Sequence, residues 1–231
     1  MRELKKAPRI TVTKDGPYLV EGGLPLAHQH IVTNSEGESL EWRKGKELPA
    51  QQEYRLCRCG QSGSKPFCDG THQKAGFDGT ETASRAPYAE QAQRTEGPQM
   101  VLDDAEGLCA FARFCDPQGQ VWNLVGHTDQ EAARKLVVHE AGHCPGGRLV
   151  ARDRATGKAH EPHFEPSIGL VQDTAKDISG PIWVRGGVPI VSADGTPWEV
   201  RNRVTLCRCG ASSNKPFCDG SHARTGFDDR K

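Results

Sequence analysis

The stretch CRCGQSGSKPFCDGTH at residues 57–72 decides the fold, because it returns as CRCGASSNKPFCDGSH at residues 207–222. The two stretches differ at only four of sixteen positions. Flanking segments repeat as well: GPYLVEGGLPL (16–26) pairs with GPIWVRGGVPI (180–190), and AGFDG (75–79) pairs with TGFDD (225–229). The chain therefore contains an internal duplication, and such repeats have to be recognised before any local structure is assigned.

The first copy of the duplication carries an insertion. The copies are offset by 164 residues at the flanking segments but by 150 at the cysteine-rich stretches, a difference of 14 residues. The extra residues lie around IVTNSEGESLEWRKGKE (31–47), which we expect to form a hairpin or a surface loop. Each copy otherwise consists of short apolar strands, the cysteine-rich stretch and one or two helical turns.

Composition indicates a small β-rich protein of the α+β class. The 231 residues include 26 Gly and 15 Pro, with 35% hydrophobic residues, which is typical of short elements joined by many turns. Lys plus Arg and Asp plus Glu number 30 each, so no net charge favours nucleic acid or a membrane surface as partner. The first residues, MRELKKAPRITV, lack the apolar segment of a secretory signal, so we expect a cytoplasmic protein.

The nine cysteines fall into three groups of three. The groups are Cys57, Cys59 and Cys68; Cys109, Cys115 and Cys144; and Cys207, Cys209 and Cys218. Odd-numbered groups do not pair evenly into disulfides, which are also rare in a reducing compartment. The grouping therefore predicts metal ligation.

Each cysteine-rich stretch offers four ligands: a C-x-C pair, then a cysteine followed four positions later by a histidine. At the start of a helix, Cys68 and His72 would project from one face. Zinc accepts three cysteines and one histidine, but C-x-C is tight for a single tetrahedral ion. A 2Fe–2S cluster offers two metals, one for each pair. The spacing favours iron–sulfur and leaves zinc or an inert structural role open.

Both stretches resemble the CDGSH iron–sulfur signature of the mitoNEET-type family, C-x-C-x2-[ST]-x3-P-x-C-D-G-[ST]-H. The resemblance implies that each copy binds a 2Fe–2S cluster, through Cys57, Cys59, Cys68 and His72 and through Cys207, Cys209, Cys218 and His222. In that family two loops meet across a homodimer beneath a small β-cap with exchanged strands. Here the tandem copies imply an intramolecular pseudo-dimer, so that a monomer suffices.

Three pairs of neighbouring residues are candidates for supporting the clusters. We interpret Asp69 and Asp219 as helix caps, with proton exchange as the alternative. Arg58 and Arg208 either bond to sulfide and offset cluster charge, or are exposed turn residues. The third pair is Ser62 and Ser212.

The segment between the copies carries Cys109, Cys115 and the Cys144–Pro145 step. Bacterial ferredoxins use C-x2-C-x2-C plus a remote Cys-Pro, and the middle position here is Ala112. Three cysteines suit a 3Fe–4S cluster. A 4Fe–4S cluster is the alternative if water or a side chain holds the fourth iron, and three buried reduced cysteines remain the structural alternative. The fourth ligand would come from His143, His127 or Asp116.

The same segment resembles a divergent single-cluster ferredoxin-like domain. The resemblance rests on Cys109, Cys115, Trp122, a helix over residues 129–141 and CPGGRL at 144–149. The match is looser because Gly146, Gly147 and Arg148 replace the family's residues. We expect the helix to start with a capping box from Thr128 to Glu131.

These observations predict three domains: a first CDGSH domain over 1–80, a ferredoxin-like cluster domain over 81–178, and a second CDGSH domain over 179–231. The favoured function is electron transfer with an unknown redox partner. Cluster storage and transfer to an apo-acceptor protein, or redox or pH sensing, is the alternative. No nucleotide, flavin or nicotinamide motif is present in the sequence, so we predict no enzymatic activity.

Overall fold

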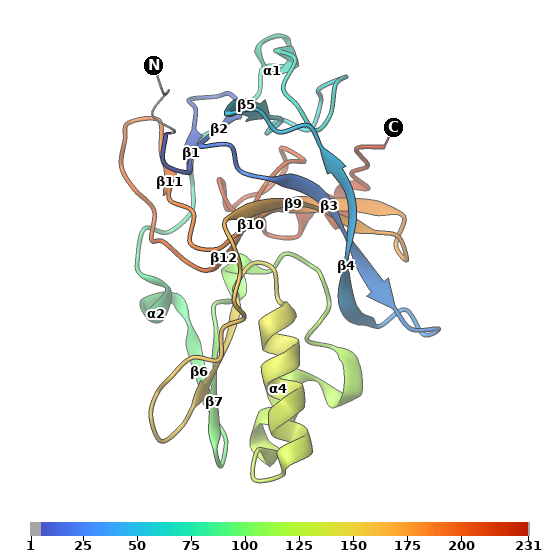
Figure 1. Cartoon of the computed structure of the whole chain (residues 1–231), viewed down its shortest axis with the longest axis vertical. Coiled ribbons are helices and arrows are strands. Elements are labelled where there is room, and N and C mark those ends of the chain that lie inside the picture. Colours follow the sequence, from blue (N-terminus) through green and yellow to red (C-terminus); the bar gives the residue numbers. More distant parts are fainter. Residues whose placement is uncertain (1–5, 231) are drawn as a thin grey trace.

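Strands from the two copies of the duplication are exchanged between two sheets in the computed structural model, which describes residues 6–230 (Figure 1). The first sheet has the order β11-β1-β2-β5. Its strands are β1 Arg9–Val12, β2 Tyr18–Glu21, β5 Glu53–Leu56 and β11 Ile190–Val191. The short strand β11 from the second copy pairs in parallel with β1, with Ile10 opposite Ile190.

The second sheet mirrors this arrangement in the order β12-β10-β9-β3-β4. Its strands are β3 Leu26–Thr33, β4 Ser39–Leu48, β9 Ser167–Asp173, β10 Ile178–Arg185 and β12 Arg203–Leu206. Strand β3 from the first copy pairs in parallel with β9, with Leu26 opposite Ile168. Because Leu26 and Ile190 are equivalent in the duplication, the exchange is reciprocal. The predicted small β-rich α+β fold with exchanged strands is confirmed.

The insertion of the first copy forms the expected hairpin. Strands β3 and β4 are antiparallel, with Ile31 opposite Trp42, and β4 is the edge strand of the second sheet. In the second copy, the residues after β11 return to the cysteine-rich stretch without such a strand. The hairpin is therefore the main difference between the two copies.

One hydrophobic core serves both copies. Ile10 and Val20 of the first copy and Ile168 and Val184 of the second are each at most 1% exposed and belong to one cluster. Burial of an aliphatic side chain of this size contributes about 1.5–3 kcal/mol. Because strands and core are both shared, neither copy can bury its apolar face alone.

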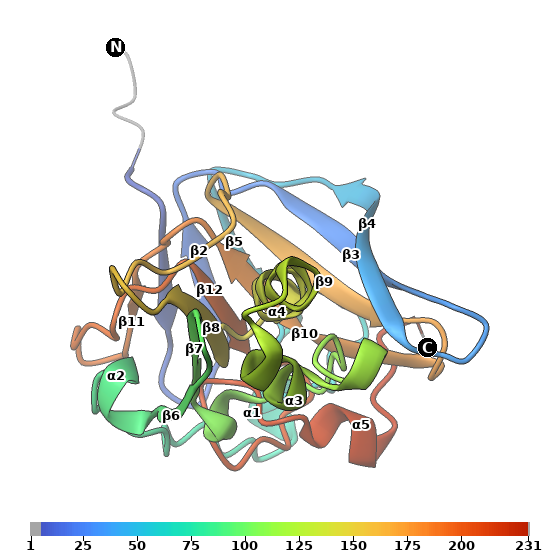
Figure 2. The same ribbon diagram turned by 90° about the horizontal axis from the view of Figure 1, so that it is seen from below.

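The central segment forms a smaller unit below the two larger sheets in Figure 1. It contains the sheet β6-β7-β8, with β6 Gln93–Glu96, β7 Met100–Asp104 and β8 Leu149–Asp153. Helices α3 Val121–Leu124 and α4 Glu131–His143 pack on this sheet, as Figure 2 shows from below. Leu102, Val137 and Leu149, all fully buried, are the centre of its own core. The domain boundaries themselves stay a prediction.

The capping box predicted at the start of α4 is wrong. Helix α4 begins at Glu131, after Gln130, and has no side-chain cap. The Thr128 hydroxyl instead donates to the Val125 carbonyl and accepts the amide of Met100 at 3.3 Å. The strand and the preceding turn therefore use the hydroxyl that the sequence pattern assigned to the helix.

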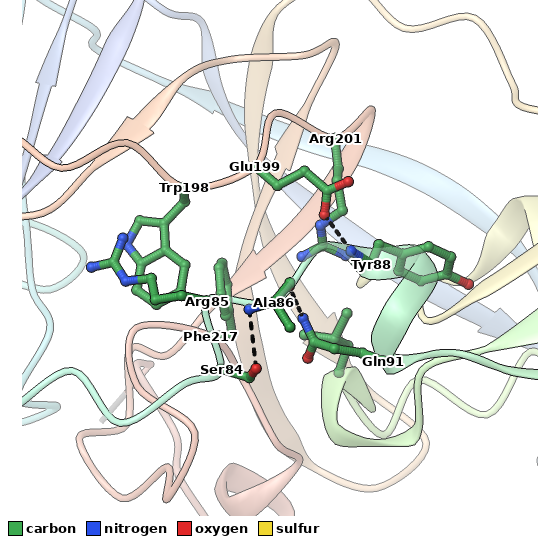
Figure 3. A pocket seen from close by; sticks show the side chains of 10 residues that line it. Ser84, Arg85, Ala86, Tyr88, Gln91, Trp198, Glu199, Arg201 and Phe217 are labelled. Carbon is green, nitrogen blue, oxygen red and sulfur yellow. Dashed lines mark hydrogen bonds between the residues drawn. The ribbon is translucent and has the colours of Figure 1, made fainter.

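Residues 84–99 contain α2 Tyr88–Gln91 and β6 and dock onto the second copy (Figure 3). The Arg85 guanidinium lies 3.4 Å from the ring centre of Trp198, and the Tyr88 amide donates to Glu199 at 2.6 Å. The Tyr88 hydroxyl donates to the Arg148 carbonyl at 2.8 Å. This segment therefore joins the central unit to the second copy. Within residues 6–230, no helix has the length and apolar character that a bilayer span requires.

Candidate metal centres

The two cysteine-rich loops hold their ligand atoms in the same geometry. In the first loop the Sγ atoms of Cys57 and Cys59 are 3.7 Å apart, and Cys68 Sγ lies 3.4 Å from His72 Nδ1. The second loop repeats both distances, 3.7 Å between Cys207 and Cys209 and 3.4 Å between Cys218 and His222. Each loop therefore presents two ligand pairs.

The spacing between the pairs fits two metals better than one. Zinc–sulfur bonds of about 2.3 Å place two sulfurs about 3.8 Å apart on a tetrahedral edge, so each pair suits one metal. A single ion would also need the two pairs close together. Among residues 6–230, the one group with three ligand atoms all within 4.8 Å of one another is Glu41, His139 and His143. No three ligands of either loop meet this condition, which fits a 2Fe–2S cluster and disfavours a single zinc ion.

The histidine of each loop lies on a short helix, α1 Thr71–Lys74 or α5 Ser221–Thr225. Gly70 precedes α1 in the left-handed conformation, with φ of 88°. The Asp69 carboxylate accepts the amides of Thr71 at 3.0 Å and Gly63 at 2.8 Å, and these bonds hold its pKa well below the usual range. The carboxylate therefore stays ionised and ties the helix start to the loop, but the N-cap residue of α1 is Gly70, so the interpretation of Asp69 as the helix cap is wrong.

The loop serines and arginines are buried in both copies. Ser62 donates to the Phe67 carbonyl at 2.7 Å and closes its loop, as Ser212 does in the second copy. Arg58 and Arg208 are 1% and 3% exposed, so the alternative of exposed turn residues is wrong.

The two arginines bring positive charge to the cysteines. Burial lowers the pKa of Arg208, while Asp229 and, more weakly, the sulfurs of Cys57 and Cys209 oppose this shift, so Arg208 lies near both loops. Arg58 has a buried Nε without a hydrogen-bond partner in the described chain. A sulfur acceptor would satisfy such a donor.

The two loops meet back to back at a pair of glycines. A Cβ atom placed on Gly60 would lie 2.5 Å from the carbonyl oxygen of Cys209, and one on Gly210 would lie 2.5 Å from that of Cys59. Both glycines have positive φ, 77° and 80°. Only glycine allows this close backbone approach, which brings the two ligand sets together.

The cysteine–histidine pair of the second loop is covered, whereas that of the first loop is partly open to solvent. Cys218 and His222 are 2% and 4% exposed, but Cys68 and His72 are partly exposed. Burial and the Arg208 charge lower the pKa of His222 to about 4. Burial also raises the pKa of the Cys218 thiol well above its usual value.

The cover over the second loop comes from the central segment. A Cβ on Gly220 would lie 3.3 Å from Phe111 Cβ and 3.5 Å from the carbonyl oxygen of Cys109, whereas nothing lies within 4 Å of a Cβ on the equivalent Gly70. Arg113 forms an ion pair with Asp173 on β9, which anchors the covering loop. The central cysteines and the second loop are therefore direct neighbours.

A tyrosine also distinguishes the two loops. The Tyr18 hydroxyl, fully buried on β2, donates to the carbonyl oxygens of Cys207 at 2.7 Å and Pro216 at 3.1 Å. The equivalent residue in the second copy is Ile182, which has no hydroxyl to offer the first loop. The first copy thus donates a hydrogen bond to the second loop, and the second copy has no equivalent donor for the first loop.

The three central cysteines surround one pocket. Cys109, Cys115 and Cys144 line a cavity of about 20 Å³, partly open to solvent, together with Ala112 and Arg148. Burial, Asp116 and the other two cysteines raise the pKa of Cys115. Three convergent thiols too far apart for a single ion fit a cluster with three cysteine ligands.

The residues that depart from the ferredoxin-like pattern have structural roles. A Cβ on Gly146 would lie 2.5 Å from the Leu108 carbonyl oxygen, and one on Gly147 would lie 2.7 Å from that of Arg203. Arg148 forms a bidentate ion pair with Asp104, at 2.6 and 2.8 Å. Asp104 and, more weakly, the nearby Cys109 raise the pKa of Arg148. These departures therefore bring positive charge and close backbone packing to the central cysteines.

Arg203 holds the third central cysteine in place. It is 1% exposed on β12, and its guanidinium donates to the carbonyl oxygens of Ala141 and Cys144, the latter at 2.8 Å. These are carbonyls that the end of α4 leaves without a helical partner. The second copy thus fixes the backbone at Cys144, a role that the sequence analysis did not foresee.

Only one of the three expected fourth ligands lies beside the central cysteines. The Asp116 carboxylate accepts a hydrogen bond from Cys115 Sγ at 3.7 Å. His143 points to Glu41, 2.9 Å from its Oε2, and exposed His127 does not line the pocket. Of the three expected donors, Asp116 alone contacts a central cysteine, although it does not line the pocket.

One group of potential metal ligands was missed in the sequence. Glu41 of β4 and His139 and His143 of α4 converge, and residues 139–143 read HEAGH. The H-E-x-x-H pattern on a helix, which places two histidines on one face, could have revealed the pair. Nothing in the sequence marked Glu41.

Comparison with known proteins identifies the repeated modules. The family described as "Iron-binding zinc finger CDGSH type" matches residues 15–73 and 179–223, and leaves the central segment unmatched. No curated protein and no solved structure matches the chain. The tandem CDGSH motifs inferred from the sequence are confirmed.

Proposed function

We propose that this chain, with its tandem CDGSH modules, is an iron–sulfur protein that transfers electrons through three neighbouring centres. Two 2Fe–2S clusters would be held by the Cys3His sets of the loops, and a 3Fe–4S cluster by the three central cysteines, or a 4Fe–4S cluster if Asp116 adds a ligand. Each bound cluster would supply a one-electron redox centre, and a histidine ligand in place of cysteine raises its reduction potential.

The order of the ligand sets carries the proposal. The first and second loops touch through Gly60 and Gly210, and the second loop touches the central cysteine segment through Gly220. The three sets therefore form a row, with the second loop in the middle. Electron transfer requires neighbouring centres, whereas ligand sets with only a structural role do not need to lie next to one another.

Access to the row is uneven. The first loop exposes part of Cys68 and His72, whereas in the middle set Cys218 and His222 are buried and Cys209 is partly exposed. A redox partner would therefore exchange electrons at the first loop or at the central pocket. The buried guanidiniums of Arg58 and Arg208 and the amides that approach Cys59, Cys68 and Cys218 at 3.4–3.5 Å would stabilise the reduced, more negative state.

Donation of a cluster to an apo-acceptor protein is the second candidate. The partly exposed ligands of the first loop favour it, because a cluster leaves most readily from a site that solvent reaches. In the second site the equivalent ligands, Cys218 and His222, are buried. Location in the cytoplasm, the monomeric state and the lack of enzymatic activity stay predictions.

Reduction kinetics of single-site variants test the relay. In Cys68→Ala, which removes the first centre, a small redox protein should reduce the second centre at least about tenfold more slowly than in the wild type. The second centre must keep its own EPR signal, which checks that the variant is intact. Unchanged reduction rates both in Cys68→Ala and in Cys109→Ala, which removes the central centre, contradict a relay. Rapid transfer of iron and sulfide to apo-ferredoxin favours the second candidate.

A further inference from the structure

The inserted hairpin of the first copy and the helix of the central unit form a second kind of ligand group, unrelated to the cysteines. Glu41 on β4 and His139 and His143 on α4 have ligand atoms that all lie within 4.8 Å of one another. The hairpin is fixed to the helix, because Trp42 Nε1 donates to the His143 carbonyl at 3.0 Å and its ring stacks 4.7 Å from that of Trp183. The group is thus held by two rigid elements.

The hydrogen bonds of His143 leave one ring nitrogen free to bind a metal. Its Nδ1 lies 2.7 Å from the His139 carbonyl oxygen and can only donate there, so the neutral ring presents the lone pair of Nε2. That lone pair faces Glu41 Oε2 at 2.9 Å. Two acceptors at this distance need a positive group between them, either a proton or a metal ion. Metal-binding histidines typically have their other nitrogen fixed by such a carbonyl.

The group opens into a cavity of about 570 Å³ between α4, the hairpin and β10. Three donors that line this cavity have no hydrogen-bond partner in the described chain: Gln29 Nε2, Trp183 Nε1 and Arg185 Nε. Gln29 and Trp183 are only 3% and 1% exposed. Buried donors without partners cost free energy, and a ligand with oxygen acceptors would satisfy them.

We propose that Glu41, His139 and His143 bind a zinc-class divalent cation whose open position faces this cavity and takes an oxyanion ligand. Two imidazoles and a carboxylate favour zinc-class ions over magnesium or calcium. Three protein ligands with an open fourth position are typical of zinc sites that bind a small molecule. The inference does not depend on the iron–sulfur function, because it uses none of the cysteines.

The site does not carry the catalytic base that the H-E-x-x-H pattern suggests. Glu140 is 2% exposed, lines neither this cavity nor the adjoining one at Met100 and Arg134, and has Asp116 and Glu38 as charged neighbours. In the H-E-x-x-H metalloproteases this glutamate acts as the general base. The site therefore binds a cation and a ligand without peptidase chemistry.

Zinc titration of the full-length, cluster-loaded protein tests the cation site. Calorimetry should give one zinc ion per chain while the visible absorbance of the clusters stays unchanged. Glu41→Gln keeps a hydrogen-bonding group beside His143 but removes the carboxylate, and should weaken binding by more than the ~10–100-fold that loss of an outer-shell partner costs. The control Glu165→Gln, in the exposed His163–Glu165 pair, should leave zinc binding unchanged.

The opposite results overturn the proposal. If the wild-type protein takes up no zinc, or if Glu41→Gln binds zinc as tightly as the wild type, a proton and not a metal ion lies between His143 Nε2 and Glu41 Oε2. If Glu41→Gln has a lower melting temperature than the wild type, His139→Gln is measured instead, because this variant leaves the contact between Glu41 and His143 in place. His139→Gln must then show the same loss of zinc affinity. With zinc bound, inorganic phosphate should bind, and Arg185→Met should weaken it at least tenfold. If phosphate binds equally well without zinc, or equally well to Arg185→Met, the proposed oxyanion ligand is wrong.

Discussion

The two CDGSH loops present identical ligand separations in different surroundings. Both have Sγ atoms 3.7 Å apart and a cysteine–histidine pair at 3.4 Å. Yet Phe111 covers the second loop and the Tyr18 hydroxyl donates a hydrogen bond to it, whereas the first loop has neither contact. The difference arises outside the repeated stretches, from the inserted central segment and from one substitution between the copies. The duplication thus gives both loops the same ligand geometry, and residues that are not repeated give them different surroundings.

Acid should separate the two sites most strongly. Burial and Arg208 lower the pKa of His222 to about 4, so its neutral, ligating form persists as the pH falls through 6 and 5. His72 is partly exposed, so solvent protons reach it. At pH 5 the first cluster should therefore be lost at least about tenfold faster than the second.

Variants that retain one loop cluster each allow this to be measured. Absorbance decay of Cys218→Ala reports the first site, and that of Cys68→Ala reports the second. Equal decay rates at pH 5, or faster loss from the buried site, would show that the covering loop does not protect its neighbour.

Alanine at the glycines that join the loops should have the next largest effect. Gly60→Ala or Gly210→Ala places a methyl group 2.5 Å from a carbonyl oxygen at positive φ. Left-handed strain and overpacking together should lower the free energy of unfolding by about 2–4 kcal/mol. Chemical denaturation measures this, and both variants should also disturb electron exchange between the loop clusters.

Gly76→Ala is the matched control for this pair. Gly76 also has positive φ, 60°, but nothing lies within 4 Å of an added Cβ. It should show the cost of strain alone, about 1 kcal/mol. A Gly60→Ala variant as stable as this control would mean that the loops do not need their close contact.

Removal of the Tyr18 hydroxyl should give the smallest and most local effect. Tyr18→Phe leaves the buried carbonyls of Cys207 and Pro216 without this donor, at a cost of about 1–2 kcal/mol. Only the second cluster should be lost faster in a chelator challenge. Tyr54→Phe, which removes a similar bond to the Leu24 carbonyl at 2.7 Å, should destabilise the fold without this selectivity. Equal cluster loss in both variants would contradict a specific role for Tyr18.

The sequence predicted what is local and repeated. The ligand spacing, the hairpin at residues 31–47 and the exchanged strands all followed from the duplication and the resemblance that it supports. The convergence of Cys109, Cys115 and Cys144 on one pocket agrees with their grouping in the chain. Whether these residues bind clusters stays a prediction.

Long-range contacts could not be predicted from the sequence. Thr128 fits a helix cap by spacing, but a strand 28 residues away takes its hydroxyl. Arg203 and Tyr18 serve ligands 59 and 189 positions distant. The burial of Arg58 and Arg208 likewise depends on packing between the two copies. Such long-range contacts produce no recognisable pattern in the sequence. The HEAGH pattern at residues 139–143 is recognisable, but the sequence analysis did not use it.

The central claim is that all three groups of cysteines hold iron and sulfide. Iron, zinc and acid-labile sulfide analysis of the freshly purified protein, combined with EPR before and after reduction, tests it most directly. The account predicts a coloured protein with two 2Fe–2S signals that appear only on reduction, and a 3Fe–4S signal already present in the oxidised state. A colourless protein that contains zinc at the cysteines, or no metal, would contradict the account.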